Sequence, residues 1–103
     1  MAIFQMIVTN KWADSATPEQ VEAILTDFTY RKVPILAALA GTQSGSYSNE
    51  GNRREPNFKT TFYGSNYPRL NGIKSRYDAD DIFIVPTGVG SDRWDEAGFC
   101  RIH

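Results

Sequence analysis

Residues 62–70, which read FYGSNYPRL, surround Asn66 and Tyr67 with further aromatic side chains, a glycine, a proline and an arginine. Gly64 is suited to end a short helix over residues 58–62, and a polar side chain at position 65 or 66 can cap the helix that follows. Amide, phenol and guanidinium groups can also bind or orient a polar ligand. The stretch therefore predicts two helices joined at a turn, with a functional site or the remains of one.

The first half of the chain predicts a helix with a well-defined start. In Thr17-Pro18-Glu19-Gln20, Thr17 and Gln20 can form a capping box, and Pro18 suits the first helical position. Pro34 disfavours helix at the preceding residue, so a kink or a break is expected at Val33. One apolar face of this helix repeats with helical spacing at Val21, Ile24, Leu25 and Phe28.

Short extended segments are expected on both sides of the helices, at residues 3–8, 46–50 and 82–85. β-branched and aromatic residues dominate the first of them, which favours a strand. We therefore predict an α+β fold, a single domain over residues 1–103, in which two or three helices pack on a short antiparallel sheet. Such a small sheet needs its face and edges covered, which predicts a homodimer. Residues 86–103 are expected to form an extended tail anchored by Trp94 and Phe99.

Composition excludes several classes of function. The chain has 103 residues and a net charge of −1, so it carries no basic field for nucleic acid or for an anionic membrane. No apolar run is long enough to cross a bilayer, and the first residues do not resemble a secretory signal, so a cytoplasmic protein is expected. With one cysteine there is no intrachain disulfide, and Cys100 with His103 supplies too few ligands for a metal.

Two further patterns are assigned to ordinary structure. The acidic run at residues 78–81 lacks the glycine and the distal glutamate of a calcium loop, which favours a solvated helix end. The Gly-Val-Gly at residues 88–90 is not flanked by the strand and helix of a phosphate-binding loop, which favours a turn. The only histidine is the last residue, so no hydrolase triad of the usual kind can form.

The remaining chemistry lies in phenol, amide, carboxylate and guanidinium side chains that can move a proton or orient a substrate without a cofactor. On residue types alone, amphipathic packing of the tyrosines and a helix cap at Asn66 are favoured over a site. The candidates are Tyr47, Asn49, Glu50, Tyr63, Asn66, Tyr67 and Arg69.

Read together, Tyr47-Ser48-Asn49-Glu50, Asn66-Tyr67-Pro68-Arg69-Leu70 and Pro86-Thr87-Gly88 resemble the C-terminal end of the berberine-bridge-enzyme-like flavin oxidases, especially their fungal branch. The resemblance covers the second half of the chain well and the first half loosely. It implies that Tyr47 faces the substrate over the flavin and assists proton removal, and that Asn66 and Tyr67 lie near the flavin. These relatives hold FAD in a large N-terminal domain, which this sequence is expected to lack.

The leading hypothesis is a cofactor-independent catalyst that cyclises or isomerises a small intermediate of secondary metabolite biosynthesis. In it, Tyr47, Glu50 and Tyr67 are catalytic, and Asn49, Tyr63, Asn66 and Arg69 bind the substrate. No metal is expected, and FAD only if a partner supplies the missing domain. The alternatives are part of an FAD-dependent oxidoreductase, as a fragment or a complementing subunit, and a non-catalytic binding protein.

Overall fold

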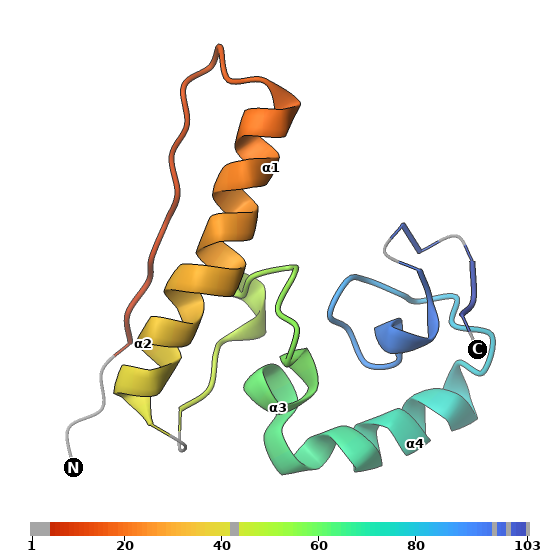
Figure 1. Ribbon diagram of the computed structural model, residues 1–103. Helices are drawn as coiled ribbons and strands as arrows, with labels where there is room; N and C mark the ends of the chain where they lie inside the picture. Colours follow the sequence, from red (N-terminus) through yellow and green to blue (C-terminus); the bar gives the residue numbers. More distant parts are fainter. Residues whose placement is uncertain (1–4, 42–43, 96, 99, 103) are drawn as a thin grey trace. The chain divides into compact units, whose positions relative to one another are not determined.

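The computed structural model describes residues 5–41, 44–95, 97–98 and 100–102 of the chain. These fall into two compact units, one within Met1–Ser44 and the other within Gly45–His103. Figure 1 shows the first unit in red to yellow and the second in green to blue. Each unit is described separately below.

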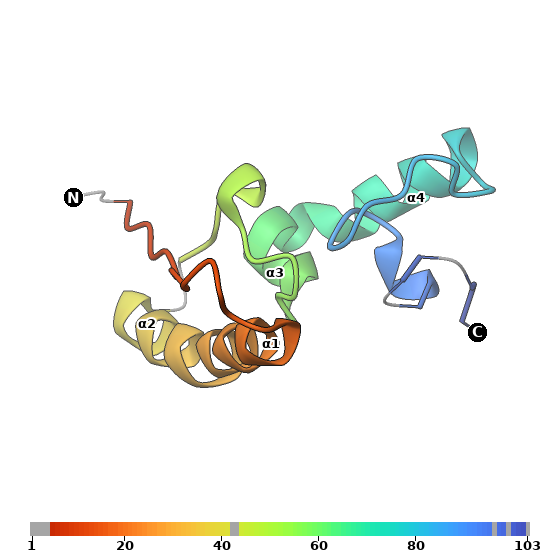
Figure 2. The same cartoon turned by 90° about the horizontal axis from the view of Figure 1, so that it is seen from above.

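The first unit is a long helical rod. It consists of α1 (Pro18–Asp27), a π-helical turn (Phe28–Lys32) and α2 (Val33–Ala40), which Figure 2 shows end to end from above. The predicted capping box is confirmed: the Gln20 amide donates to Thr17 Oγ1 at 3.3 Å, and the Thr17 amide donates to Gln20 Oε1 at 2.9 Å. Gly41 ends α2 with a φ of +79°, which suits glycine.

Pro34 changes the type of helix without breaking the rod. Proline has no N–H to donate to the preceding turn, and its ring crowds the carbonyl four residues earlier. The π-helical turn directly before α2 accommodates this, because its wider hydrogen-bond spacing relieves the crowding. The helix therefore continues through Val33, where the sequence had suggested a kink or a break.

The predicted antiparallel sheet is wrong. Among the described residues the structure contains helices and turns, and its only bridge of β type is an isolated antiparallel one between Trp94 and Arg101. Residues 5–12 are extended and run along the length of the rod in Figure 1, but they are not part of a strand. Their β-branched and aromatic side chains favour an extended backbone locally. A strand also needs a neighbouring strand with which to form hydrogen bonds. The fold is helical, not α+β.

The second unit is built around two short helices that meet at Gly64. They are α3 (Phe58–Tyr63) and α4 (Tyr67–Tyr77), joined by the 3₁₀ turn Gly64–Asn66. The predicted end of the first helix at Gly64 is confirmed, with a φ of +56° that glycine adopts easily. Asn66 occupies the capping position of α4 but makes no side-chain cap hydrogen bond.

The tail folds back on the second unit instead of extending away from it. It contains the 3₁₀ turn Ser91–Arg93, and Trp94 bonds to Asp81, four residues after the end of α4. Phe99, the other expected anchor, lies outside the described residues. Ser48–Glu50, expected to be a strand, is a 3₁₀ turn.

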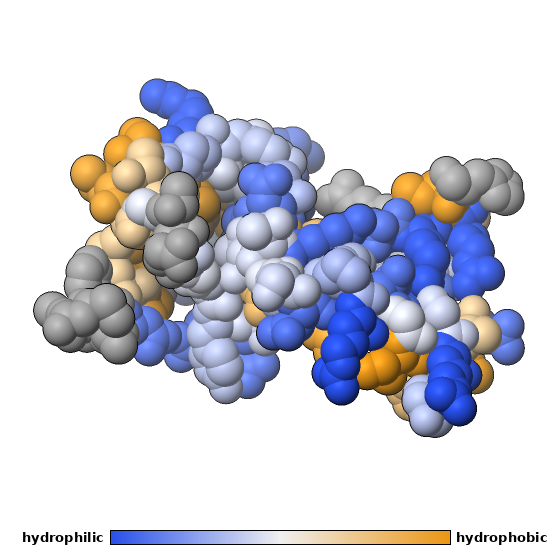
Figure 3. Space-filling model, turned by 90° about the horizontal axis from the view of Figure 1, so that it is seen from below, coloured by the Kyte–Doolittle hydropathy of each residue, from blue (hydrophilic) through white to orange (hydrophobic). Residues whose placement is uncertain are grey.

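Little apolar surface is buried. In the part of the chain that the structure describes, Tyr67 is the one buried hydrophobic residue, and the polar side chains of Thr29 and Asp81 are buried as well. Hydrophobic side chains, orange in Figure 3, reach the surface in several places. None of the described helices has the length and hydropathy needed to cross a membrane.

Candidate functional site

Tyr47, Asn49 and Glu50 lie together in an exposed loop of the second unit. Tyr47 directly precedes the 3₁₀ turn Ser48–Glu50, and Asn49 Nδ2 donates to the Tyr47 hydroxyl at 2.9 Å. The Ser46 amide donates to the carbonyl of Thr61 at 2.9 Å, which ties this loop to α3. The structure therefore presents the Tyr47 phenol at the surface on an anchored loop, oriented by an amide.

A close packing contact at Gly51 fixes the far end of the same loop. A Cβ added at this position would lie 2.5 Å from Cζ of Phe62, so only a hydrogen fits beside that ring. The glycine lets the loop backbone approach α3 closely. We call residues 46–51 the Tyr47 loop. Its orientation depends on α3, which contacts it at both Ser46 and Gly51.

Tyr63 and Tyr67 form an aromatic cluster with Phe58. The Tyr67 ring lies 5.8 Å from the Tyr63 ring and 5.8 Å from the Phe58 ring, in the tilted and edge-to-face arrangements that aromatic pairs prefer. Tyr63 donates its hydroxyl to the carbonyl of Thr87 at 3.1 Å. The cluster therefore holds α3, α4 and the chain after Pro86 together.

The Tyr67 hydroxyl is fully engaged. It donates to Asp92 Oδ1 at 2.7 Å and accepts the Gly90 amide at 3.2 Å. Burial raises the pKa of Tyr67, and the hydrogen bond to Asp92 raises it further. The phenol is therefore protonated at neutral pH and acts here as a hydrogen-bond donor within the unit.

Lys59 completes this group from α3. Its ammonium lies 2.8 Å from Asp92 Oδ2 and 5.2 Å from the centre of the Tyr67 ring. Burial would raise the pKa of Asp92, but hydrogen bonds from Lys59 and Tyr67 outweigh it and hold the pKa below its ordinary value. Asp92 thus stays ionised and links both helices to the Ser91–Arg93 turn.

Asp81 is the centre of a second polar group that the sequence did not predict. Its side chain has no exposed surface. It accepts hydrogen bonds from Arg93, from Trp94 Nε1 at 2.8 Å and from Arg101 Nη2 at 2.9 Å. Burial would raise the pKa of Asp81, but these donors outweigh it and hold the pKa far below its ordinary value. The carboxylate is therefore the anchor of the folded-back tail.

The assignment of residues 78–81 to a solvated helix end was wrong for two of its carboxylates. Besides the buried Asp81, Asp78 is paired with Lys74 and accepts the amides of Ile82 and Phe83, at 2.8 and 3.0 Å. The only signal in the sequence was the presence of arginine and tryptophan in the tail. Nothing in local spacing pairs them with a carboxylate twelve or more residues away.

The structure places the remaining candidates, Asn66 and Arg69, at the exposed start of α4. It brings Tyr63 and Tyr67 together, and separately Tyr47 and Asn49, with Glu50 in the same turn. The roles of these seven residues stay predictions. Three or more potential metal ligands do not gather anywhere among the residues that the structure describes.

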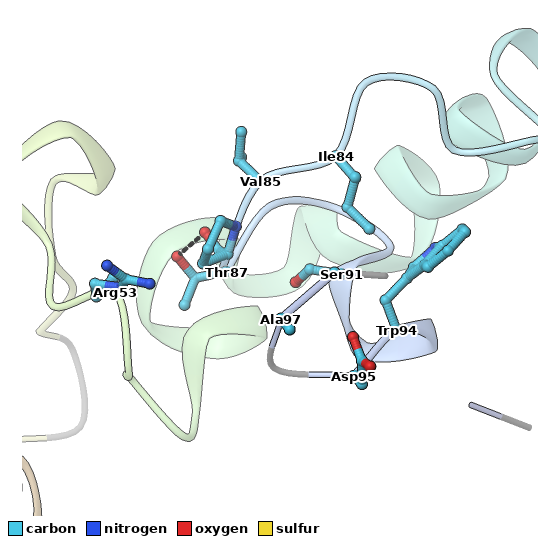
Figure 4. Close-up of a pocket in the computed structure, with 10 residues that line it drawn as sticks. Arg53, Ile84, Val85, Thr87, Ser91, Trp94, Asp95 and Ala97 are labelled. Atoms are coloured by element: carbon cyan, nitrogen blue, oxygen red, sulfur yellow. Dashed lines mark hydrogen bonds between the residues drawn. The ribbon is translucent and has the colours of Figure 1, made fainter. Parts of the chain in front are cut away.

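A pocket of about 380 Å³ lies elsewhere in the second unit, open to solvent, and Figure 4 shows its lining. Trp94 and Asp95 contribute to it from the tail, Ile84 from the segment between α4 and the tail, and Arg53 from the loop before α3. None of the predicted site residues lines it. Its size is at the lower end of the range for pockets that enclose a drug-sized ligand.

The turn at residues 88–90 does not offer its glycine amides to a phosphate group of FAD. The turn at residues 88–90 is the one glycine pair that resembled a phosphate loop, and its amides are already used. The Gly88 amide donates to the Val85 carbonyl at 2.9 Å, and the Gly90 amide donates to Tyr67. A phosphate-binding loop needs such amides free to point at the ligand. This confirms the turn and leaves no cradle for a pyrophosphate there.

A family model and individual relatives identify the same protein family for this chain. Residues 46–90 match the model of the family described as "Berberine and berberine like". An uncharacterized FAD-linked oxidoreductase of Arthroderma benhamiae is 38% identical over 100 residues, which cover 97% of this chain and 17% of that protein. The FAD-linked oxidoreductase asqF of Emericella nidulans is 44% identical over 81 residues, covering 78% of this chain and 14% of its own length.

A solved structure agrees with these matches. The crystal structure of the VAO-type flavoprotein MtVAO615 from Myceliophthora thermophila C1 has a TM-score of 0.78 and 39% identity, covering 88% of this chain and 17% of its own. The chain thus spans less than a fifth of the length of the relatives it matches. On these matches, the chain belongs to the berberine-bridge-enzyme-like family of FAD-linked oxidoreductases, of which it represents the C-terminal segment.

Proposed function

We propose that this chain serves as the C-terminal segment of an FAD-linked oxidoreductase, next to a flavin that another part of the enzyme holds. The observation that carries the proposal is the match over nearly the whole chain to a protein about six times as long, described as an FAD-linked oxidoreductase. The amides of Gly88 and Gly90 are bonded within the chain, so the proposal does not place the flavin phosphates at this turn.

The residues of the Tyr47 loop are those best placed to meet a substrate. The Tyr47 phenol is 60% exposed and is held by Asn49 on a loop fixed to α3. A phenol in this position can take up or return a proton at a substrate brought against it. Arg69 and Asn66 are exposed at the start of α4 and supply polar groups for orientation. Tyr67 supports this surface from within, since its hydroxyl is bound by Asp92 and Gly90.

The cofactor-independent cyclase or isomerase is supported less well by the geometry. Catalysis without a cofactor needs groups that enclose the substrate and exclude water. Tyr47 and Glu50 are exposed, and the pocket of the second unit is lined by other residues. If the isolated chain converted a substrate, and Tyr47→Phe and Glu50→Gln both abolished this, the cyclase hypothesis would replace ours.

The test is a chimera in which this chain replaces the matching segment of MtVAO615. We expect the chimera to keep its visible flavin absorption after desalting and the isolated chain, mixed with FAD, to lose it. Flavin retained by the isolated chain, or lost from the chimera, would contradict the proposal. The mass of the isolated chain in solution tests the homodimer separately.

A further inference from the structure

The open pocket of the second unit, which we call the Arg53 pocket, carries two side-chain donors that bond to nothing in the described part of the chain. They are the guanidinium of Arg53, which also has no ion pair there, and the hydroxyl of Ser91. The other donors on its lining, Trp94 Nε1 and the Thr87 hydroxyl, already donate within the chain. The unused donors therefore favour a ligand that accepts hydrogen bonds.

Apolar groups supply a second part of the lining. Ile84, Pro86 and the ring of Trp94 contribute to it. Figure 4 shows Arg53 at one end of the pocket and Trp94 at the other. A guanidinium binds a carboxylate through two parallel hydrogen bonds, and an aromatic body packs well against an indole ring. This arrangement matches a ligand with an anionic head and an aromatic body.

The backbone of the pocket is strained at Thr87. This residue has a φ of +60°, which a β-branched residue rarely adopts. Strained residues of this kind cluster at functional sites, where the surrounding structure holds them. Here the Thr87 carbonyl accepts the Tyr63 hydroxyl at 3.1 Å, and the Gly88 amide donates to the Val85 carbonyl at 2.9 Å. This wall of the pocket is therefore preformed, which reduces the entropy lost when a ligand binds.

Asp95 restricts the kind of anion that fits. It lines the same pocket and lies near Trp94 in Figure 4, so the described lining residues carry one positive and one negative side chain. A ligand with a second carboxylate would be repelled by Asp95. The volume of about 380 Å³ is at the lower end of the range for ligand pockets. The Arg53 pocket is therefore suited to a small monocarboxylate.

We propose that the Arg53 pocket binds a small aromatic monocarboxylic acid. Arg53 pairs with the carboxylate, Ser91 supplies a further donor, and the aromatic body lies against Trp94. None of the seven residues predicted for the site lines this pocket, so it is a second site in addition to the Tyr47 loop. The inference goes beyond the proposed function and does not depend on where the flavin is held.

The first test is a titration of the full chain with phenylacetate, followed by the fluorescence of Trp94. Trp12→Phe is introduced in every protein, so that Trp94 is the only tryptophan. We expect a saturable change with a midpoint of about 10 mM or below, as suits a ligand of this size in an open pocket. Phenylacetamide has a similar shape without the charge and should bind about tenfold more weakly. A signal that does not saturate with phenylacetate would overturn the proposal.

Variants show whether the pocket itself binds the probe. Arg53→Gln should weaken the binding of phenylacetate about tenfold and leave that of phenylacetamide unchanged, and Ser91→Ala should weaken phenylacetate about threefold. Arg76→Gln is the matched control, because Arg76 is also exposed in this unit but does not line the pocket. Circular dichroism should be the same for all of them. Equal affinity of Arg53→Gln and Arg76→Gln for phenylacetate would contradict the assignment.

The MtVAO615 chimera shows whether the pocket is accessible in an enzyme of full length. Ligand-observed nuclear magnetic resonance should detect phenylacetate binding to the flavin-loaded chimera, and Arg53→Gln should weaken it. If only the isolated chain shows binding that depends on Arg53, the rest of the enzyme covers the pocket and the proposal falls. A chimera that holds no flavin would count against the proposed function alone, since the titration of the isolated chain still tests the pocket.

Discussion

At the scale of single residues, the second unit depends on two carboxylates more than on apolar burial. Asp81 collects three donors from the tail, and Asp92 joins Lys59 to Tyr67. Only one hydrophobic residue is buried in the described part of the chain. Removing one member of a buried ionic group is costly, because the remaining charges lose their partner without regaining water.

Asp81→Asn is expected to lower the free energy of unfolding by about 2–3 kcal/mol, somewhat below the usual cost because the partner arginines are partly exposed. Chemical denaturation followed by tryptophan fluorescence measures this, since Trp94 donates to Asp81. Asp80→Asn is the matched control, because its carboxylate is exposed one residue away. Equal stability of the two variants would contradict the central role of Asp81.

The same carboxylate predicts how stability depends on pH. The folded-state pKa of Asp81 lies below its ordinary value of 3.8, so the folded state favours the ionised form. This contribution is complete above about pH 4 and is lost as the pH falls from there towards the lowered pKa. Denaturation between pH 7 and pH 2 should therefore show a decline below about pH 4 that is smaller in Asp81→Asn. A decline of the same size in both proteins would assign it to other carboxylates.

Two tyrosines of the candidate site should respond differently to loss of the hydroxyl. Tyr67→Phe leaves the buried Gly90 amide without its acceptor, at a cost of about 1–2 kcal/mol. Tyr47→Phe removes an exposed hydroxyl bonded to Asn49 and should stay within about 0.5 kcal/mol. Thermal unfolding of both variants decides whether Tyr67 is mainly structural. A larger loss of stability in Tyr47→Phe than in Tyr67→Phe would contradict the structural role assigned to the Tyr67 hydroxyl.

At the scale of elements, local signals in the sequence predicted the helix ends. The capping box at Thr17 and the glycine at position 64 act within a few residues, so their chemistry is visible without the fold. Asp81 could not be found in this way, because its donors come from residues 93, 94 and 101. The expected sheet failed for the same reason, since strand pairing depends on distant partners and side-chain pattern alone does not supply them.

Thr17→Ala tests the predicted start of α1. It removes the hydroxyl that accepts the Gln20 amide and should cost about 1 kcal/mol of helix stability. The measurement is thermal unfolding followed by circular dichroism. Thr26→Ala serves as the control, since Thr26 is exposed in the same helix and alanine is the better helix former there. Equal midpoints for the two variants would mean that the capping box does not stabilise the rod.

At the scale of the whole molecule, large apolar side chains are exposed to solvent in both units. Leu39 on α2 is 82% exposed and Phe83 after α4 is 83% exposed, each within its own unit. The matched relatives are about six times as long as this chain, and under the proposed function the rest of such a protein covers these residues. The predicted membership of the flavin oxidase family was confirmed because its motifs are short and contiguous in the sequence.

The central claim is that the surface of this segment is completed by the flavin-binding part of an FAD-linked oxidoreductase. Hydroxyl-radical footprinting of Phe83 tests it most directly, in the isolated chain and in the flavin-loaded MtVAO615 chimera. The account predicts strong labelling of Phe83 in the isolated chain and labelling several times weaker in the chimera, with Tyr47 as an internal reference. Equally strong labelling of Phe83 in a chimera that holds its flavin would contradict the account.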